Sequence, residues 1–574
     1  MAAALPALPF AAAGGGPVGL FVLLASLLVG TFVMLPKRRH SGGIGQLPGP
    51  KQHPLLGNFL DLATPRSHQV VEEWGRRFGA LARFKLLHDS ILITDPVVVE
   101  DVLGRRGAEE LPKPALIYKP LDPIYSPKSI PSFFTTPDAS MWAAVRKGCM
   151  PAFSADNMRK AFPVVRDAVQ EVGDHLEAQA ALPAGKQGLD MQEASLRVAL
   201  DSFALPALQH DFGARHCGEC EVLQVLPELL AEFSLRALNP LRAFWQTLAP
   251  WTSDAAAFSS NLRKAHALWA QLAAEVRATD LAAADVAGDT SLRACLARLR
   301  DPATGQLLTE EQLGPQVAAF LVAGFETTAH SVSWALYELA RNEGVQAKLA
   351  AELAGAGLAS APGRPARQLE LADLSSLPYL DQVWREALRL HPVASIGPIR
   401  QADRDVTLKN GLHVPKGTML WTSVAAILTS PNNFTDSQRF WPERWAQPGA
   451  VAAADRVQAP TPVAAAAAAA DGEGTEAAAG GRCPFGFSGQ PTPAGNSADL
   501  KRSFPVFSYG PRDCMGQALA NMVGKTMLAS LVSRFSMRVA PRMGSYEEVR
   551  VAEVNRLTMQ SGVGVWLLLE PRSS

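Results

Sequence analysis

The chain has 574 residues, of which 48% are hydrophobic, so it can bury a large core. Its 54 basic side chains balance 54 acidic ones, and the resulting net charge of zero excludes a global field that would attract nucleic acid or an acidic substrate. Six scattered cysteines are too few for a disulfide framework in a chain of this length and favour a reducing, cytosol-facing location.

The N-terminus has the composition of a membrane anchor. Residues 1–36 carry no charged side chain, and residues 18–35 are mostly apolar, at the short end of the roughly 17–25 residues that span a bilayer. Lys37-Arg-Arg39 follows, so the positive-inside rule predicts that the rest of the chain faces the cytosol. We predict a transmembrane helix with a basic, proline-containing hinge over residues 1–44, and one large domain over 45–574.

Two other kinds of N-terminal leader fit this segment less well than an anchor does. A cleaved signal peptide would have a basic start and a shorter apolar core, and this segment has neither. A chloroplast transit peptide would be rich in Ser and Arg, which residues 1–17 lack. The alanine content of those residues keeps the chloroplast alternative open.

The start of the large domain alternates between helical and strand patterns. Apolar side chains at helical spacing predict helices over residues 68–78 and 96–103. Two short strands are expected between them, over residues 80–84 and 90–94. Seven prolines lie between residues 111 and 138, and we predict a long loop without regular structure there.

The next part of the chain is helical by pattern and sparse in recognisable chemistry. Trp142 and Arg146 stand four residues apart and share one helix face, which a packed tryptophan beside a solvated arginine would also explain. Residues 190–300 have a mostly helical pattern. Cys217 and Cys220 could suggest zinc, but no second ligand pair stands at a suitable spacing, and we interpret them as part of a surface loop.

A long apolar stretch over residues 317–339 predicts a buried helix. Residues 309–312, Thr-Glu-Glu-Gln, have the pattern of a capping box, which marks a helix start. Pro315 conflicts with a start that early, so we predict that the main helix begins near Gly314 with the proline in its first turn.

Within that helix lies the segment Ala323-Gly-Phe-Glu326-Thr327-Thr328. The hydroxyl of Thr327 can bind the carbonyl of Ala323, four residues earlier, and such competition bends a helix. A polar step in a buried helix would not require an acid beside two threonines. We therefore predict that this segment is functional.

Charged residues recur in the following segments. Glu386 and Arg389 are three residues apart and can pair on a helix, and residues 440–445 supply a second arginine, Arg444. Arg400 leads into a predicted hairpin with its turn at Asn410-Gly411.

Residues 446–500 have a low-complexity composition that includes a run of alanines, and they would bury little apolar surface. We predict a disordered insert. Cys483 in this segment lacks both an arginine two residues before the sulfur and a helix after it, so we do not expect it to bind a metal.

Near the C-terminus, Phe507-Ser-Tyr-Gly510-Pro-Arg512-Asp-Cys514-Met-Gly516 joins a loop to an apolar helix. A cysteine at a helix N-terminus is expected to have a lowered pKa, and the thiolate is the form that binds metal. Gly510 and Gly516 would let a flat cofactor approach the backbone. Alone, Cys514 would be read as a buried structural cysteine, the usual fate of a lone cysteine.

With four neighbouring residues in register, this loop resembles the Phe-x-x-Gly-x-Arg-x-Cys-x-Gly haem-binding loop of the cytochrome P-450 superfamily, the haem-thiolate monooxygenases. The Ala-Gly-x-Glu-Thr-Thr, Glu-x-x-Arg and Trp-x-x-x-Arg segments resemble further family motifs and occur in family order. The resemblance covers roughly residues 45–570, although the insert makes the connection before Phe507 much longer than is usual in the family. It implies a mainly α fold with a small β-rich lobe and haem b as cofactor.

The resemblance also assigns roles to individual residues. It implies that Cys514 is the axial ligand of the haem iron and that Glu326 and Thr327 relay protons to oxygen. It further implies a buried structural triad of Glu386, Arg389 and Arg444. Other residues are expected to contact or hold the haem: Arg512, Phe507, Gly510, Gly516, Trp142, Arg146, Arg400 and Ala323.

The implied reaction is the insertion of one oxygen atom from O₂ into a lipophilic molecule such as a fatty acid, sterol or terpenoid. The chain carries no flavin or nicotinamide fingerprint, so a separate membrane-bound, NADPH-dependent flavoprotein reductase is the expected partner. Two alternatives remain: a haem-thiolate isomerase or dehydratase acting on a peroxide, against which the Glu326-Thr327 pair argues, and a non-catalytic haem-binding protein. The anchor resembles that of endoplasmic-reticulum members of the family, and a chloroplast membrane is the alternative location.

Overall fold

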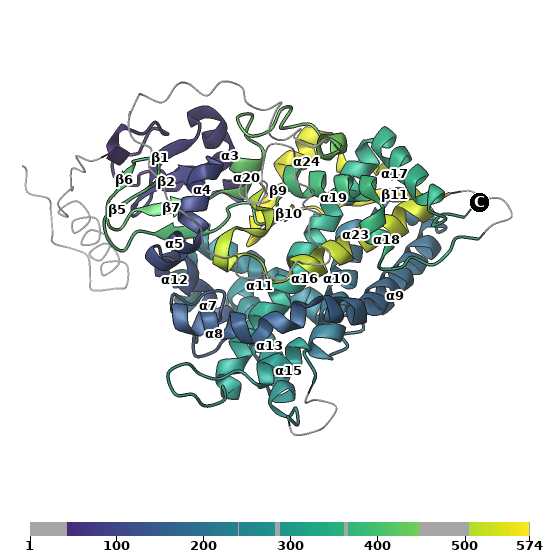
Figure 1. The fold of residues 1–574 in the computed structure, drawn as a ribbon, viewed down its shortest axis with the longest axis horizontal. Coiled ribbons are helices and arrows are strands. Elements are labelled where there is room, and N and C mark those ends of the chain that lie inside the picture. Colours follow the sequence, from purple (N-terminus) through teal and green to yellow (C-terminus); the bar gives the residue numbers. More distant parts are fainter. Residues whose placement is uncertain (1–42, 239, 282–287, 361–364, 447–503, 573–574) are drawn as a thin grey trace, which may run out of the picture.

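The computed structural model describes residues 43–238, 240–281, 288–360, 365–446 and 504–572. The described chain is mainly helical, with small sheets gathered on one side of the helices, as the sequence predicts (Figure 1). Among these residues no helix has both the length and the apolar character that a membrane crossing requires. The predicted transmembrane run and residues 447–503, nearly all of the predicted insert, lie outside the described residues.

The largest sheet lies at the upper left of Figure 1 and has the strand order β1-β2-β7-β4. Its core is formed by aromatic contacts: the ring of Phe84 lies 5.3 Å from that of Trp74 and 5.4 Å from that of Trp421, measured between ring centroids. The predicted helices and strands around this sheet are confirmed to within about a residue. They are α3 (Ser67–Phe78), β1 (Leu81–Lys85), β2 (Asp89–Ile93) and α4 (Pro96–Leu103), and the other two strands are β4 (Ile399–Gln401) and β7 (Met419–Trp421).

Three smaller sheets complete the β structure. The predicted hairpin is present, and Gly411 in its turn has a φ of 82°, a value that favours glycine. The strands of these sheets are β5 (Val406–Thr407) with β6 (His413–Val414), β9 (Glu553–Arg556) with β10 (Thr558–Ser561), and β3 (Leu189–Asp190) with β11 (Trp566–Pro571) and β8 (Phe535–Val539).

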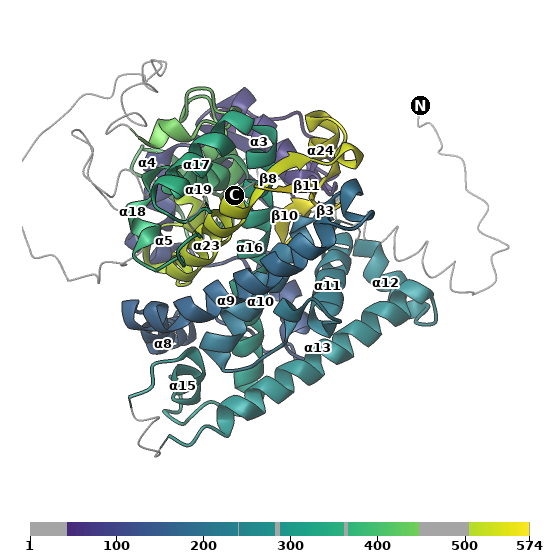
Figure 2. The same cartoon turned by 90° about the vertical axis from the view of Figure 1, so that its right-hand side faces the viewer.

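The central element is α16 (Glu310–Arg341), which packs against α10 (Met191–Leu208), α13 (Ser253–Arg277) and α23 (Gln517–Arg534). Figure 2 shows α9 (Ala155–Ala180), α10, α11 (Glu221–Leu238) and α13 together on one side of the molecule. The remaining helices of five or more residues are α5 (Arg105–Glu110), α8 (Ala139–Cys149), α12 (Pro240–Leu248), α15 (Leu292–Ala297), α17 (Glu343–Gly355), α19 (Pro378–Leu390), α20 (Val424–Leu428) and α24 (Tyr546–Ala552).

The predicted start of the central helix near Gly314 is wrong. The helix begins at Glu310, because Thr309 and Gln312 form a complete capping box: the Thr309 hydroxyl accepts from the Gln312 N–H at 3.3 Å, and Gln312 Oε1 accepts from the Thr309 N–H at 3.0 Å. Pro315 lies inside the helix and is buried. It removes one backbone donor, and the two reciprocal cap bonds offset that loss.

The prediction that residues 111–138 lack regular structure is also wrong. The segment contains α6 (Ala115–Tyr118), η2 (Lys119–Leu121) and α7 (Asp122–Tyr125). Pro120 and Pro123 occupy first turns, where a helix makes no use of the backbone N–H that proline lacks. Closely spaced prolines therefore break this segment into short helical turns instead of excluding helix.

Candidate active site

The loop that carries Cys514 is fixed by its own backbone. The N–H of Cys514 donates to the carbonyl of Phe507 at 2.9 Å, which closes the loop over two 3₁₀ turns, η7 (Pro505–Phe507) and η8 (Gly510–Arg512). Helix α23 starts three residues after the cysteine, with Gly516 as its N-cap. The cysteine thus stands at a helix N-terminus, as predicted.

Cys514 does not have the lowered pKa that its position predicts. Its side chain is accessible to solvent, although many protein atoms lie close around it. Burial raises the pKa of the Cys514 thiol to about 11 and outweighs the N–H groups of Gly516 and Gln517, which lower it. Without a bound cation this thiol is neutral near pH 7, and metal binding would release its proton.

Gly510 and Gly516 lack a side chain for different structural reasons. Gly510 has a φ of 76°, and a Cβ there would lie 2.1 Å from the carbonyl oxygen of Leu103. It therefore allows contact with the protein's own backbone. A Cβ on Gly516 would meet no protein atom closer than 3.9 Å, and one of those atoms is the sulfur of Cys514. Gly516 is the glycine that keeps the space beside the sulfur free.

Trp142 and Arg146 of α8 contact the cysteine loop directly. Arg146 Nη1 donates to the carbonyl of Asp513 at 2.7 Å, and the same guanidinium forms an ion pair with the Asp513 carboxylate. The guanidinium carbon of Arg512 lies 4.3 Å from the ring centroid of Trp142. The structure brings these predicted residues together, but among the described residues Arg146 is engaged by Asp513.

Arg512 and Arg400 each have a buried N–H donor that makes no hydrogen bond to a described residue. Arg400 is 2% exposed, and neither its Nε nor Nη1 of Arg512 has a hydrogen-bond partner in the described part of the chain. Burial lowers the pKa of both side chains, and for Arg512 burial and then the charge of Arg400 together lower it to about 10. Unsatisfied buried guanidinium groups favour an anionic partner such as a carboxylate.

The sequence did not identify the third cation of this group, Lys113. Its ammonium donates to the carbonyl of Phe134 and lies 4.8 Å from the ring centroids of Tyr118 and Phe134. Burial and then the charges of Arg400 and Arg512 hold its pKa well below the usual value. Lys113 lies between two prolines, and no motif in the sequence marks it. We call Lys113, Arg400 and Arg512 the cation group.

Helix α16 leaves one short face exposed. It is buried over most of Leu313–Ala340, but Ala323 is exposed, and Gly324 and Thr327 are partly exposed. The Thr327 hydroxyl donates to the Ala323 carbonyl at 3.0 Å, as the sequence predicts. A Cβ on Gly324 would lie 2.3 Å from the ring of Phe203 in α10, so this glycine serves helix packing.

Glu326 is 4% exposed, and Thr558 and His330, which it contacts, are themselves buried. Its Oε1 accepts from the Thr558 hydroxyl at 3.0 Å and lies 3.8 Å from Nε2 of His330. Its Oε2 has no hydrogen-bond partner among the described residues. Thr558 and His330 are neighbours that sequence reasoning missed, because Thr558 is far away in the chain and His330 stands in an otherwise apolar stretch.

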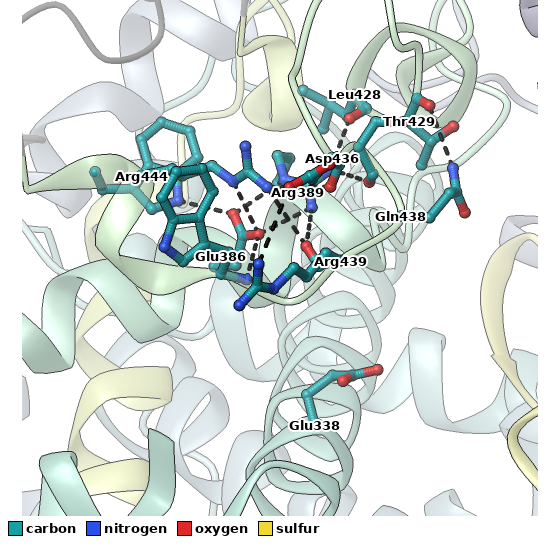
Figure 3. A network of polar contacts seen from close by, with 12 residues as sticks. Glu338, Glu386, Arg389, Leu428, Thr429, Asp436, Gln438, Arg439 and Arg444 are labelled. Atoms are coloured by element: carbon teal, nitrogen blue, oxygen red, sulfur yellow. Dashed lines mark hydrogen bonds and ion pairs between the residues drawn. The ribbon is translucent and has the colours of Figure 1, made fainter. Parts of the chain in front are cut away.

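Glu386, Arg389 and Arg444 meet as a buried cluster, which Figure 3 shows with its carbonyl partners. Glu386 binds Nη2 of Arg389 at 2.9 Å and Nε of Arg444 at 3.0 Å, and it also accepts from the N–H of Trp441 and the indole of Trp445. Other N–H groups of Arg389 and Arg444 donate to backbone carbonyls, which include those of Leu428, Ser437, Arg439, Thr435 and Asp436. We call this set the Glu386 cluster.

A solvent-accessible thiol before a helix, a helix with an exposed face and a group of cations with unpaired buried donors fit a flat iron porphyrin with carboxylate side chains. The fold and the site therefore define the class of haem-thiolate oxidoreductases. Comparison with known proteins agrees: the family model of cytochrome P450 matches residues 47–459 and 490–549. The chain belongs to the cytochrome P450 family.

Several curated relatives are similar along most of this chain. A cytochrome P450 of Caenorhabditis elegans is 26% identical over 561 residues, which are 92% of this chain and 94% of the relative. Cytochrome P450 CYP99A1 of Sorghum bicolor is 26% identical over 76% of this chain and 83% of its own length, and leukotriene-B4 omega-hydroxylase 3 of Mus musculus is 24% identical over 96% and 94%. The protein is a P450-type, haem-dependent monooxygenase that uses O₂ and electrons from a redox partner.

Proposed function

We propose that this protein inserts one oxygen atom from O₂ into a C–H bond of a lipophilic small molecule, with electrons from a separate NADPH-dependent flavoprotein reductase at the membrane. The observation that carries the proposal is the solvent-accessible thiol of Cys514, together with the exposed face of α16 at Ala323 and Thr327. Relatives whose names state hydroxylation of leukotriene B4 or of a sterol support a lipophilic substrate class.

Haem b, when bound, supplies the oxygen-activating chemistry, with thiolate ligation that favours O–O cleavage. In this proposal Cys514 gives its thiolate to the iron, and Gly516 keeps the space beside the sulfur free. The cation group binds the two haem carboxylates, because its unpaired donors need acceptors. Phe507, Gly510, Trp142 and Arg146 hold the cysteine loop in place through the contacts described above.

Thr327 and Glu326 supply protons. The Thr327 hydroxyl donates its hydrogen to the Ala323 carbonyl, so its oxygen can accept a hydrogen bond from a water on the exposed helix face. Oε2 of Glu326 has an unused acceptor site and lies on the adjoining residue of the helix. We assign to Thr327 the positioning of that water and to Glu326 the resupply of its proton.

The proposed location is the endoplasmic-reticulum membrane, with residues 1–44 as anchor and the large domain in the cytosol; a chloroplast membrane is the alternative. The described residues also offer an apolar surface for peripheral contact. Around α12, Phe244, Trp245 and Leu248 are each about half exposed, and Trp251 is 78% exposed. Exposed apolar patches of this kind mark interaction with membranes or partners.

The decisive experiment measures the absorption spectrum of the reduced, carbon monoxide-bound protein. Cys514→Ala is expected to abolish the red-shifted band of thiolate ligation, whereas Cys483→Ala is expected to retain it. NADPH consumption and product formation with purified reductase then separate a monooxygenase from an isomerase, which needs no external electrons, and from a non-catalytic protein. Loss of the band in Cys483→Ala alone would overturn the assignment of the haem loop.

A further inference from the structure

A surface cavity of about 580 Å³ lies apart from the predicted site residues, none of which lines it. Its walls come from the start of α10, from the loop that precedes α11 and from the first turn of α11, and Cys217 and Cys220 are among the lining residues. Both cysteines of the Cys-x-x-Cys segment therefore border one cavity. Neither cysteine has a part in the proposed reaction.

The loop between these cysteines is held in place by a single arginine. Arg197 Nη1 donates to the carbonyl of Gly218 at 2.9 Å and to that of Ala214 at 3.2 Å, and its Nη2 binds Glu193 at 2.8 Å. Cys217 has a φ of 57°, a left-handed conformation that few residues other than glycine adopt. The tight turn is thus maintained by specific contacts.

The two thiols have different surroundings. Cys217 is partly exposed, and its sulfur donates to the carbonyl of Arg215 at 3.4 Å. Cys220 is buried directly before α11, and the N–H groups of Leu223 and Val222 at the start of that helix lower the pKa of its thiol. Burial raises the pKa of both thiols, and the Arg197 charge and these N–H groups oppose that effect. Cys217 is the accessible thiol, and Cys220 is the thiol whose charged form the N–H groups at the start of α11 favour.

We propose that Cys217 and Cys220 form a dithiol site for reversible oxidation by hydrogen peroxide. Cys217 is oxidised first, to a sulfenic acid, with release of water. The Cys220 sulfur then displaces the sulfenic oxygen as a second water and forms a disulfide, so two thiols and one H₂O₂ give one disulfide and two H₂O. A dithiol reductant restores both thiols.

The charges around the cavity select the oxidant. The acidic residues Asp190, Glu193 and Glu219 line it, and Arg197 is its one lining cation among the described residues. This surplus of negative charge disfavours an anionic oxidant such as glutathione disulfide and does not affect neutral hydrogen peroxide. Because burial keeps both thiols mostly protonated, oxidation is slow and requires sustained exposure to peroxide.

The test exposes the full-length, haem-loaded protein to hydrogen peroxide and follows each cysteine by peptide mass. We expect the peptide that contains both cysteines to lose two hydrogens, and a dithiol reductant to reverse the change. Cys220→Ser is expected to stop at a Cys217 sulfenic acid that dimedone traps, and Cys217→Ser to show no early product. The matched controls are Cys149 and Cys295, which are buried and stay reduced in the same digest.

Each other outcome contradicts the proposal. A stable sulfenic acid on Cys217 of the wild-type protein would mean that the two sulfurs do not meet. Oxidation of Cys149 or Cys295 before this pair would remove its selectivity. Equal or faster reaction with glutathione disulfide at the same concentration would overturn the inference from charge. Retention of the haem absorption band in both serine variants verifies that they fold, and peptide mass does not depend on enzymatic activity.

Discussion

Two regions of this protein enclose arginine side chains, and they differ in whether a carboxylate of the protein pairs with the positive charge. In the Glu386 cluster, one carboxylate binds Arg389 and Arg444, and carbonyl groups accept from the remaining donors (Figure 3). In the cation group, the positive charges of three side chains act on one another, and no described carboxylate pairs with them. A satisfied buried charge stabilises structure, whereas buried donors without acceptors indicate a binding site.

The largest effect is expected in the Glu386 cluster. Glu386→Gln removes the charge that compensates two buried arginines and should lower the free energy of unfolding by about 3–5 kcal/mol. Thermal unfolding and the yield of folded protein measure the effect. Glu443→Gln is the matched control, because Glu443 pairs with the exposed Lys348 and should cost less than about 1 kcal/mol. Equal losses in both variants would contradict the structural role of the cluster.

The cation group should behave in the opposite way. Arg512→Leu removes a partly buried charge whose buried Nη1 has no hydrogen-bond partner among the described residues, so the haem-free protein should unfold at the same or a higher temperature. Haem binding should weaken about tenfold or more, the value of a charged hydrogen bond. Transfer of haem to an acceptor protein gives the rate of loss. Arg538→Gln, which changes an exposed arginine on β8, should have no effect, and a destabilised haem-free Arg512→Leu would contradict the comparison.

The effect of a cation without a carboxylate partner can be measured at Lys113 as a pH dependence of the unfolding free energy. Its pKa is lowered in the folded state, so between that value and the ordinary 10.5 the unfolded chain binds a proton that the folded chain does not. The stability of the haem-free protein should therefore rise with pH in this window, by at most about 1.4 kcal/mol per pH unit. The difference in unfolding free energy between wild type and Lys113→Met isolates this contribution. A difference that does not change with pH would mean that Lys113 is not a buried cation.

Variants of Thr327 test whether the free acceptor site of its hydroxyl oxygen serves the reaction. Thr327→Ala should retain haem binding and NADPH consumption but give severalfold less product and more hydrogen peroxide per NADPH, and Thr327→Ser should be milder. Thr328→Ala is the matched control, because its hydroxyl makes the same kind of backbone contact, to Gly324 at 3.4 Å, on a buried face. Equal ratios of product to peroxide in the wild type and Thr327→Ala would remove Thr327 from the mechanism.

The smallest effect is expected from the insert, which belongs to neither region. Replacing residues 448–500 by a short Gly/Ser linker changes loop-closure entropy by only ~0.6 kcal/mol per doubling of length. Haem content and melting temperature should hardly change. The family model leaves residues 460–489 unmatched, which supports an insertion at this point. A large loss of haem would show that the segment packs on the core.

Sequence reasoning predicted the helices and strands near the first sheet, because apolar periodicity is a local property. It misplaced the start of α16, since it gave the proline more weight than a capping box that the structure contains in full. It also misread the segment 111–138, where Pro120 and Pro123 lie in the first turns of short helices. These errors concern competing local signals, whose balance depends on what packs against each segment.

The sequence by itself determined the family, the position of Cys514 before a helix, and contacts within one helical turn, such as Thr327 with Ala323 and Glu386 with Arg389. These follow from spacing along the chain, which helical geometry converts directly into contact. Only the tertiary structure decided that Lys113 joins Arg400 and Arg512, and that burial raises the pKa of Cys514. Desolvation and long-range charge depend on how residues distant in sequence pack together, and no local pattern encodes them.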